Sequence, residues 1–153
     1  MRVVDILKEE MVIPELENDA KHEILRELSQ RLATLEPHVD VDNLVAILLK
    51  REDLGTTAIG EGIAIPHGKI SDLNRITAVF GIKHGGVDCG SLDGKPTKLF
   101  FLLVAPEDSA GVHLKALARV ARLLKNPAFR EQLLLTQSQA ALYKLISEED
   151  SKL

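Results

Sequence analysis

The stretch Leu99-Phe100-Phe101-Leu102-Leu103-Val104 decides the fold class, because every residue in it is apolar. A strand with one face in water alternates apolar and polar residues, since successive side chains point to opposite faces of the sheet. A run that is apolar at every position instead indicates a central strand that other elements cover on both faces. We therefore expect this segment in the middle of a layered domain.

Two further strands are predicted upstream of this run. The segment Ile76 to Lys83 alternates well enough to form a strand, and Asp93-Gly94 predicts a tight turn between it and the central run. The segment Gly62-Ile63-Ala64-Ile65-Pro66 has the pattern of a short buried strand. We expect the hydrogen-bond ladder to end at Pro66, because proline has no backbone N–H to donate.

Helical patterns occupy both ends of the chain, on either side of the predicted strands. In each of them apolar residues recur every three or four positions, after a residue that can cap the first turn. The predicted helices and caps are Lys21–Leu35 (Asn18 or Asp19), Val41 to about Lys50 (Asp40 or Asp42), about Ala110 to Leu124 (Ser109), a helix beginning at Pro127 (Asn126) and one ending near Ile146 (Ser138). The expected apolar face of the third helix is Leu114, Leu117, Ala118, Ala121 and Leu124. Helices around central strands indicate a single layered α/β domain over residues 1–153.

Composition narrows the class of protein. Aromatic residues make up 3% of the chain and the net charge is -4 with no basic stripe, so we expect no nucleic-acid partner. Cys89 is the only cysteine, which excludes an internal disulfide and fits a reducing compartment. We find no signal peptide and no stretch near the roughly 20 apolar residues of a membrane span. We therefore expect a soluble, cytoplasmic protein without membrane insertion.

The segment Gly55 to Gly68 contains four glycines and no helical period, which taken alone indicates a long turn; the alternative is a loop that binds an anion. It does not match two familiar phosphate-binding loops. Gly68-Lys69 is followed by Ile70 where a P-loop needs Ser or Thr, and Ile65 replaces the third glycine of a dinucleotide-binding fingerprint. Nucleotide binding therefore has little support.

His67 is the strongest candidate for chemistry in this loop. It lies between Pro66 and Gly68, and the glycine would let another molecule approach the imidazole closely. A neutral imidazole can attack phosphorus at physiological pH without a metal, because its pKa lies near neutrality. Glycine N–H groups and the hydroxyls of Thr56 and Thr57 would then surround the phosphoryl oxygens. The alternative is a structural histidine that bonds to nearby backbone.

His113 and Arg51 are further candidates for the same site. His113 lies in the first turn of a predicted helix and would hydrogen-bond one nitrogen of His67; the alternative is a helix-surface histidine. Arg51 ends the second predicted helix and would bind phosphoryl oxygens with two parallel hydrogen bonds. The alternative for Arg51 is a solvated cation at a helix C-terminus. No histidine spacing matches a metal motif, so we predict no cofactor; the alternative is a metal-dependent hydrolase whose site folding assembles from His67, His113 and an acid.

The sequence from Gly55 to Gly68, Gly-Thr-Thr-Ala-Ile-Gly-Glu-Gly-Ile-Ala-Ile-Pro-His-Gly, resembles the active-site signature of a known family. That family is the enzyme IIA domains of the sugar phosphotransferase system, in the fructose/mannitol class that includes the nitrogen-regulatory enzyme IIA. The segments Ser91–Pro96, Leu103–Glu107 and His113–Ala118 resemble the family in the same order, and the similarity extends from about Asp5 to Ile146. The resemblance implies a three-layer α/β/α fold, with a mixed central sheet and helices on both faces.

The resemblance also implies roles and partners. It implies that His67 is phosphorylated by the histidine-containing phosphocarrier protein, with His113 as its partner histidine and Arg51 near the phosphoryl group. The acceptor would be an enzyme IIB domain; alternatively, the output would be binding to regulatory target proteins. Two departures stand out: Ala58 where glycine is common, and Glu61 where asparagine is common, which puts a negative charge near the expected anion site.

Overall fold

Strand β6 (Thr97–Pro106) is the centre of the sheet in the computed structural model, which describes all residues from 1 to 153. Every side chain from Leu99 to Ala105 is at most 1% exposed, as the unbroken apolar run predicts. β6 pairs antiparallel with β5 (Thr77–Val87) and parallel with β3 (Ile63–Ala64) and β4 (His67–Ile70). The central run is therefore covered on both faces, as expected.

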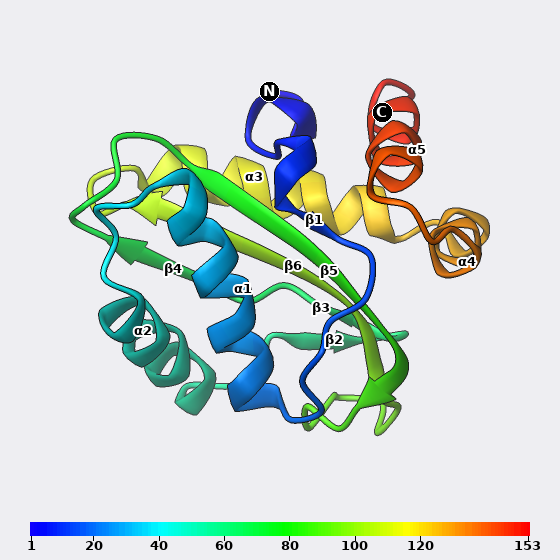
Figure 1. Cartoon of the computed structure of the whole chain (residues 1–153), viewed down its shortest axis with the longest axis horizontal. Helices are drawn as coiled ribbons and strands as arrows, with labels where there is room; N and C mark the ends of the chain where they lie inside the picture. Colours follow the sequence, from blue (N-terminus) through cyan, green and yellow to red (C-terminus); the bar gives the residue numbers. More distant parts are fainter.

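Two short strands complete a six-stranded mixed sheet. β1 (Val12–Ile13) pairs parallel with β5, and β2 (Ala58–Gly60) pairs antiparallel with β3. The strand order is β1-β5-β6-β3-β2, and β4 pairs with β6 beside this path. Figure 1 shows β4 continuing along the edge of β6 that β3 occupies farther down.

Helices cover both faces of the sheet. In Figure 1, α1 (Lys21–Leu35) and α2 (Val41–Asp53) lie in front of the strands, and α3 (Ala110–Leu124) lies behind them. The chain ends in α4 (Pro127–Leu135) and α5 (Gln139–Asp150). Short 3₁₀ helices at Val3–Asp5 and Glu9–Met11 begin the chain. This arrangement confirms the predicted α/β/α fold with a mixed sheet.

Three of the predicted caps are confirmed. The carboxylate of Asp40 accepts a hydrogen bond from the Asn43 N–H, and Asn126 and Ser138 cap α4 and α5 in the same way. The expected cap of α1 is wrong: Ala20 precedes the helix, while the side-chain amide of Asn18 donates to Glu27. The expected cap of α3 is also wrong, because the Ser109 hydroxyl donates to the Pro106 carbonyl and makes no cap hydrogen bond. The alternative caps Asp19 and Asp42 instead pair with Lys83 and Arg26.

Two other details differ from the sequence expectations. The ladder does not end at Pro66, because pairing with β6 resumes at His67, which therefore begins a strand. The predicted face of α3 is wrong at Leu114, which is 67% exposed, and at Ala118, which is also exposed, because His113 and Ala116 occupy the buried positions instead. The helix carries apolar residues on several sides, so spacing alone does not fix which side faces the sheet.

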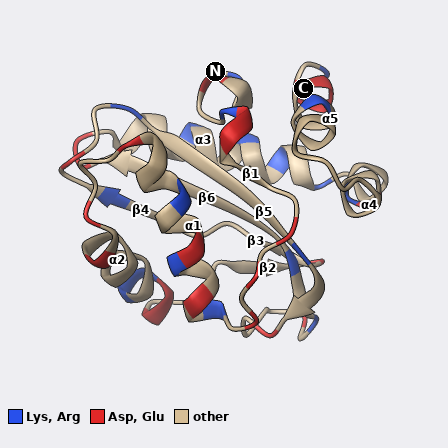
Figure 2. Ribbon diagram, in the orientation of Figure 1, with Lys and Arg blue, Asp and Glu red and all other residues tan.

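Charged residues of both signs are interspersed over the surface. Figure 2 shows Lys and Arg alternating with Asp and Glu along α1 and α2. None of the helices has the length and apolar character required to cross a bilayer.

Candidate functional site

The position of His67 follows from the way β4 packs. His67 pairs with Leu103 at the start of β4, and Gly68 pairs with Val104. A Cβ at Gly68 would lie 3.0 Å from the side chain of Ile47, so the glycine lets α2 pack closely against β4. The short residue beside the histidine thus serves helix packing, which brings the C-terminal part of α2 to the imidazole.

A backbone hydrogen bond orients the His67 ring. Its Nδ1 lies 2.8 Å from the carbonyl oxygen of Ile65. A carbonyl oxygen only accepts hydrogen bonds, so a neutral His67 carries its proton on Nδ1 and leaves the lone pair on Nε2. The hydrogen bond therefore fixes both the tautomer and the ring orientation.

His113 of α3 lies beside this ring. The ring centroids of His67 and His113 are 5.3 Å apart at an angle of 59°. No hydrogen bond joins them, and the buried Nδ1 of His113 has no hydrogen-bond partner. His113 is only 7% exposed, so it is not a helix-surface histidine. The structure therefore brings the two predicted histidines together, without the hydrogen bond expected between them.

Both rings favour the neutral form. Burial is the main reason why the pKa of His67 is lowered. The hydrogen bond to the Ile65 carbonyl opposes this shift, the charge of Arg51 lowers the pKa further, and the charge of Glu52 raises it. Burial is also the main reason why the pKa of His113 falls to about 4, with the charges of His67 and Lys69 adding to it. Near neutral pH the site holds two uncharged imidazoles.

The histidine pair opens into a pocket of about 340 Å³ with a positive lining. Its cations are Lys50 and Arg51 at the end of α2 and Lys69 of β4, and no acidic residue lines it. Arg51 Nη1 donates to the Gly55 carbonyl at 2.8 Å, which ties the guanidinium to the loop. The remaining lining residues are Ile47, Leu54, His67, Gly68 and His113. This set of cations suits a small anion such as a phosphoryl group.

Thr56 and Thr57 do not line this pocket. The Thr56 hydroxyl donates to the Cys89 carbonyl at 3.0 Å, and the Thr57 hydroxyl donates to the Glu52 carboxylate at 2.5 Å. Both hydroxyls are engaged in the framework that holds the loop, because hydrogen bonds to buried groups order the backbone around them. The structure does not place them beside His67.

Glu52 is a buried carboxylate next to Arg51 that sequence reasoning missed. Its side chain is 7% exposed and pairs with Lys21 at 2.6 Å. Burial raises the pKa of Glu52, but hydrogen bonds from Lys21 and Thr57 outweigh it and leave the pKa below its usual value. Sequence reasoning also missed the cations Lys50 and Lys69, although both are adjacent to predicted site residues.

Glu61 does not face the histidine pair, contrary to the expectation from sequence. Its carboxylate pairs with Arg130 of α4 at 2.6 Å. The negative charge is thus neutralised outside the pocket that holds His67. No group of three or more His, Cys, Asp or Glu side chains in the structure, the histidine pair included, is arranged to hold a metal ion.

Comparison with known families decides the assignment. Residues 5–149 match the family model described as "Phosphoenolpyruvate-dependent sugar phosphotransferase system, EIIA 2". The chain belongs to this EIIA 2 family. EIIA domains of this system act as phosphoryl carriers, and the resemblance predicted from residues 55–68 is confirmed.

Relatives of this EIIA 2 domain carry two kinds of name. The "Nitrogen regulatory protein" of Bradyrhizobium diazoefficiens is 39% identical over 147 residues, which are 96% of this chain and 95% of that protein. The "PTS system fructose-specific EIIABC component" of Bacillus subtilis is 33% identical over 150 residues, which are 98% of this chain and 24% of that protein. The crystal structure of nitrogen regulatory protein IIA-Ntr from Neisseria meningitidis superimposes with a TM-score of 0.87 at 28% identity, covering 94% of this chain and 98% of that one.

Proposed function

We propose that His67 carries the phosphoryl group, on its Nε2 atom. The observation that carries this assignment is the hydrogen bond between His67 Nδ1 and the Ile65 carbonyl, which leaves Nε2 as the nucleophile. The lowered pKa of His67 keeps that lone pair available near neutral pH. Family membership supports the reaction class, and the geometry of the pocket supports the atom.

In this proposal the reaction is an exchange of one N–P bond for another. Nε2 of His67 attacks the phosphorus of a phosphohistidine on the donor protein, and the donor's N–P bond breaks with its electron pair returning to the donor ring. No proton needs to move at His67, since Nδ1 keeps its hydrogen throughout. The phosphorylated ring can then transfer the group to an acceptor by the same step in reverse.

The neighbouring cations stabilise the charge that arrives. A phosphoryl group on His67 adds up to two negative charges to a pocket lined by Lys50, Arg51 and Lys69. In phosphoryl transfer the protein acts mainly by positioning reactants and stabilising charge, so these side chains supply most of what the step requires. We assign His113 to contact the phosphoryl oxygens, because its ring stands beside that of His67. Thr56 and Thr57 act indirectly, by holding the loop.

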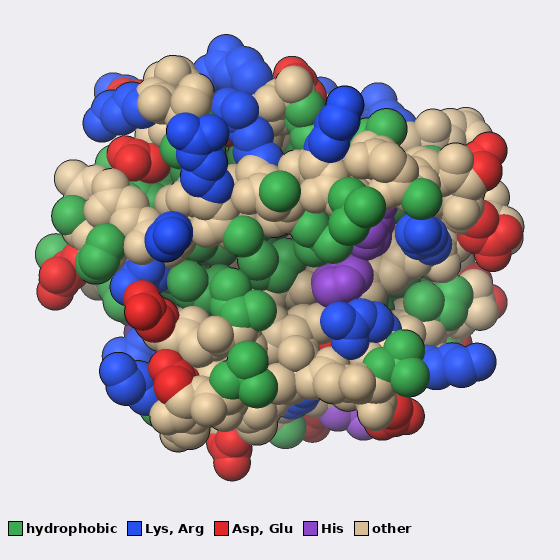
Figure 3. Space-filling view, turned by 180° about the vertical axis from the view of Figure 1, so that it is seen from behind, with side chains coloured by type: hydrophobic (Ala, Val, Ile, Leu, Met, Phe, Trp, Pro, Cys, Tyr) green, Lys and Arg blue, Asp and Glu red, His purple; other side chains and the backbone are tan.

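The surroundings of the pocket favour protein partners over a small-molecule substrate. Leu54 at the pocket is 84% exposed, and Leu114 and Val112 on α3 next to His113 are 67% and 47% exposed. Figure 3 shows apolar side chains lying next to the histidines in a hollow of this face. Exposed apolar groups around a site are typical of a protein interface. We propose the histidine-containing phosphocarrier protein as donor and an enzyme IIB domain as acceptor.

Regulation is the second candidate output. The match to this chain covers 95% of the relative named as a nitrogen regulatory protein. It covers only 24% of the fructose-specific relative. Phosphorylation at His67 would change the charge of the surface around it and so alter the binding of a target protein. Both outputs use the same phosphorylated histidine.

Phosphoryl transfer to the purified chain tests the proposal. The chain is incubated with phosphoenolpyruvate, enzyme I and the phosphocarrier protein, and the product is analysed for acid-labile phosphate. We expect one phosphate per chain, on Nε2 of His67 by ¹⁵N NMR, and none in H67A. Persistent labelling of H67A, or modification at Nδ1, contradicts the assignment. Transfer of the phosphate to a IIB domain would support the transport output. Binding of a target protein by only the phosphorylated or only the unphosphorylated chain would support the regulatory output.

A further inference from the structure

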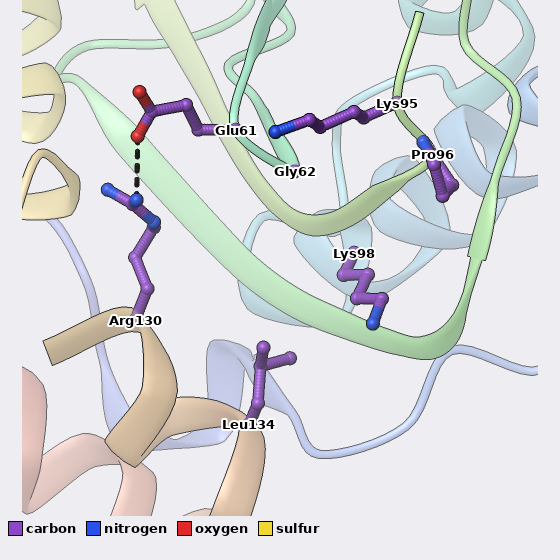
Figure 4. Close-up of a pocket in the computed structure, with 7 residues that line it drawn as sticks. All are labelled: Glu61, Gly62, Lys95, Pro96, Lys98, Arg130 and Leu134. Carbon is purple, nitrogen blue, oxygen red and sulfur yellow. Dashed lines mark hydrogen bonds and ion pairs between the residues drawn. The ribbon is translucent and has the colours of Figure 1, made fainter. Parts of the chain in front are cut away.

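A second pocket lies apart from the histidine pair and shares none of its lining residues. It encloses about 390 Å³ between the β2–β3 turn, the start of β6 and α4. Figure 4 shows Glu61 and Arg130 facing each other and Lys95 extending toward Gly62, with Leu134 on the same helix as Arg130 and Lys98 on the strand opposite. Pro96 completes the lining.

Positive charge dominates this second pocket. Its lining has three cations, Lys95, Lys98 and Arg130, against the single acid Glu61, although the chain as a whole has a net charge of -4. Arg130 is the only one of these cations with an acidic partner. Lys95 and Lys98 form no ion pair, and the acid beside Lys95 is Asp93, whose pKa is lowered first by the hydrogen bond from the Glu61 backbone and also by the charge of Lys95. Both ammonium groups lie at a concave surface where an anion can approach them.

Arg130 is held in place by the backbone. Its Nη1 donates to the carbonyls of Leu124 and Lys125 at 2.9 Å each, and its side chain is only 13% exposed. These bonds anchor the guanidinium at the C-terminus of α3 and leave Nη2 to bind the Glu61 carboxylate. A guanidinium that is already fixed binds a carboxylate favourably, because the arginine side chain loses little conformational entropy on binding.

The ion pair between Glu61 and Arg130 should contribute little to stability. The Glu61 side chain is 65% exposed, and water screens ion pairs of this kind. Glu61 is also the only non-glycine residue with a positive φ, at 57°, a conformation that L residues avoid. The backbone N–H of Glu61 donates to Asp93 at 2.8 Å, so the turn is held by a contact that does not involve the Glu61 side chain.

We propose that this pocket binds a small dicarboxylate, one end of which replaces Glu61 on Arg130. The other carboxylate would contact the ammonium groups of Lys95 and Lys98, and the carbon chain would lie against Pro96 and Leu134. Glu61 already forms a carboxylate–guanidinium contact with Arg130, which is the contact that the ligand would make in its place. The inference is independent of the role assigned to His67.

An NMR titration of the ¹⁵N-labelled full chain tests the site, with succinate and glutarate as probes and with butyrate and inorganic phosphate as controls at constant ionic strength. We expect saturable shifts of the Gly62, Lys98 and Arg130 amides with the dicarboxylates, and weaker, non-saturating shifts with both controls. E61Q removes the competing charge and should tighten binding by about 2- to 5-fold. The double variant K95A/K98A should weaken it by about 10-fold or more.

Three outcomes overturn the inference. Equal response to phosphate or butyrate would show that the pocket selects charge alone. Unchanged affinity in E61Q and in K95A/K98A, after circular dichroism has shown both to be folded, would place the ligand elsewhere. Loss of binding in R51A but not in K95A/K98A would assign the ligand to the pocket at His67 instead.

Discussion

His67 of β4 and His113 of α3 present their imidazole rings to the same pocket, with centroids 5.3 Å apart and no hydrogen bond between them. His67 belongs to the sheet and His113 to a helix that packs against it, so the pair forms only when α3 has docked. Because burial keeps both rings neutral, neither repels the other near neutral pH. The Nδ1 atom of His113 is buried in this pair and has no hydrogen-bond partner.

The stability of the protein should fall as the pH drops from about 6.5 to about 4. The pKa of His113 is lowered from 6.5 to about 4 in the folded chain, so the unfolded chain takes up a proton first over this interval. The contribution of His113 to the free energy of unfolding is fully present above pH 6.5 and is constant again below about pH 4. Urea unfolding at several pH values measures it. In H113Q the slope in this interval should be smaller, whereas H22A, at an exposed position of α1, should behave as the parent chain does.

Replacement of Arg51 should slow the phosphorylation of His67. R51A removes a guanidinium from the pocket and should lower the rate by about 100-fold, the usual effect of losing one group that stabilises developing charge. R51K should fall in between, because lysine keeps the charge but not the planar fork. R75A, which removes a cation that is 64% exposed and pairs with Glu36, is the matched control. Equal rates for R51A and R75A would exclude Arg51 from the site.

Replacement of Glu52 should destabilise the fold and remove part of its acid sensitivity. E52Q leaves Lys21 without its partner and weakens the bond from Thr57, and we expect a loss of about 2 kcal/mol in the free energy of unfolding. The value is below that of a fully buried pair because Lys21 is 27% exposed.

The sign of the Glu52 effect on pH follows from its lowered pKa. The carboxylate contributes its stabilisation above the unfolded value of 4.5 and loses it as the pH falls through the lower folded value. Urea unfolding of E52Q should therefore show a shallower decline than the parent chain below about pH 4.5. A decline of equal slope in both proteins would contradict the assigned ionisation.

Replacement of Gly68 tests how closely α2 must pack against β4. A Cβ there would meet Ile47 at 3.0 Å and Leu48 at 3.4 Å, so G68A should cost about 1 kcal/mol and displace the end of α2 that carries Arg51. G85A is the matched control, because nothing lies within 4 Å of a Cβ at Gly85. Thermal unfolding and the rate of His67 phosphorylation should both fall in G68A and stay near the parent values in G85A.

Local patterns predicted the helices well and the site only in part. The bounds of α1 and α3 and the caps Asp40, Asn126 and Ser138 depend on residues close in sequence, and the structure has them as expected. The apolar run of β6 was sufficient to place it at the centre.

Contacts between distant residues were beyond such patterns. The return of the chain to β6 at His67 depends on pairing with Leu103, which no local signal specifies. The same holds for Lys21 with Glu52 and for Glu61 with Arg130, which join elements far apart in sequence. Thr56 and Thr57 were expected at the phosphoryl group because of their proximity to His67 in sequence, yet their hydroxyls bond to Cys89 and Glu52.

The interruption between β3 and β4 has a consequence for which atom reacts. Ile65 falls in the gap, where its N–H bonds to Thr57 and its carbonyl takes no part in the ladder with β6. This carbonyl instead accepts the hydrogen bond from His67 Nδ1, which in the proposed reaction leaves Nε2 as the nucleophile. On this proposal the main chain determines which nitrogen is phosphorylated. Changes to the cations around the ring should then alter the rate of transfer and leave the site of attachment unchanged.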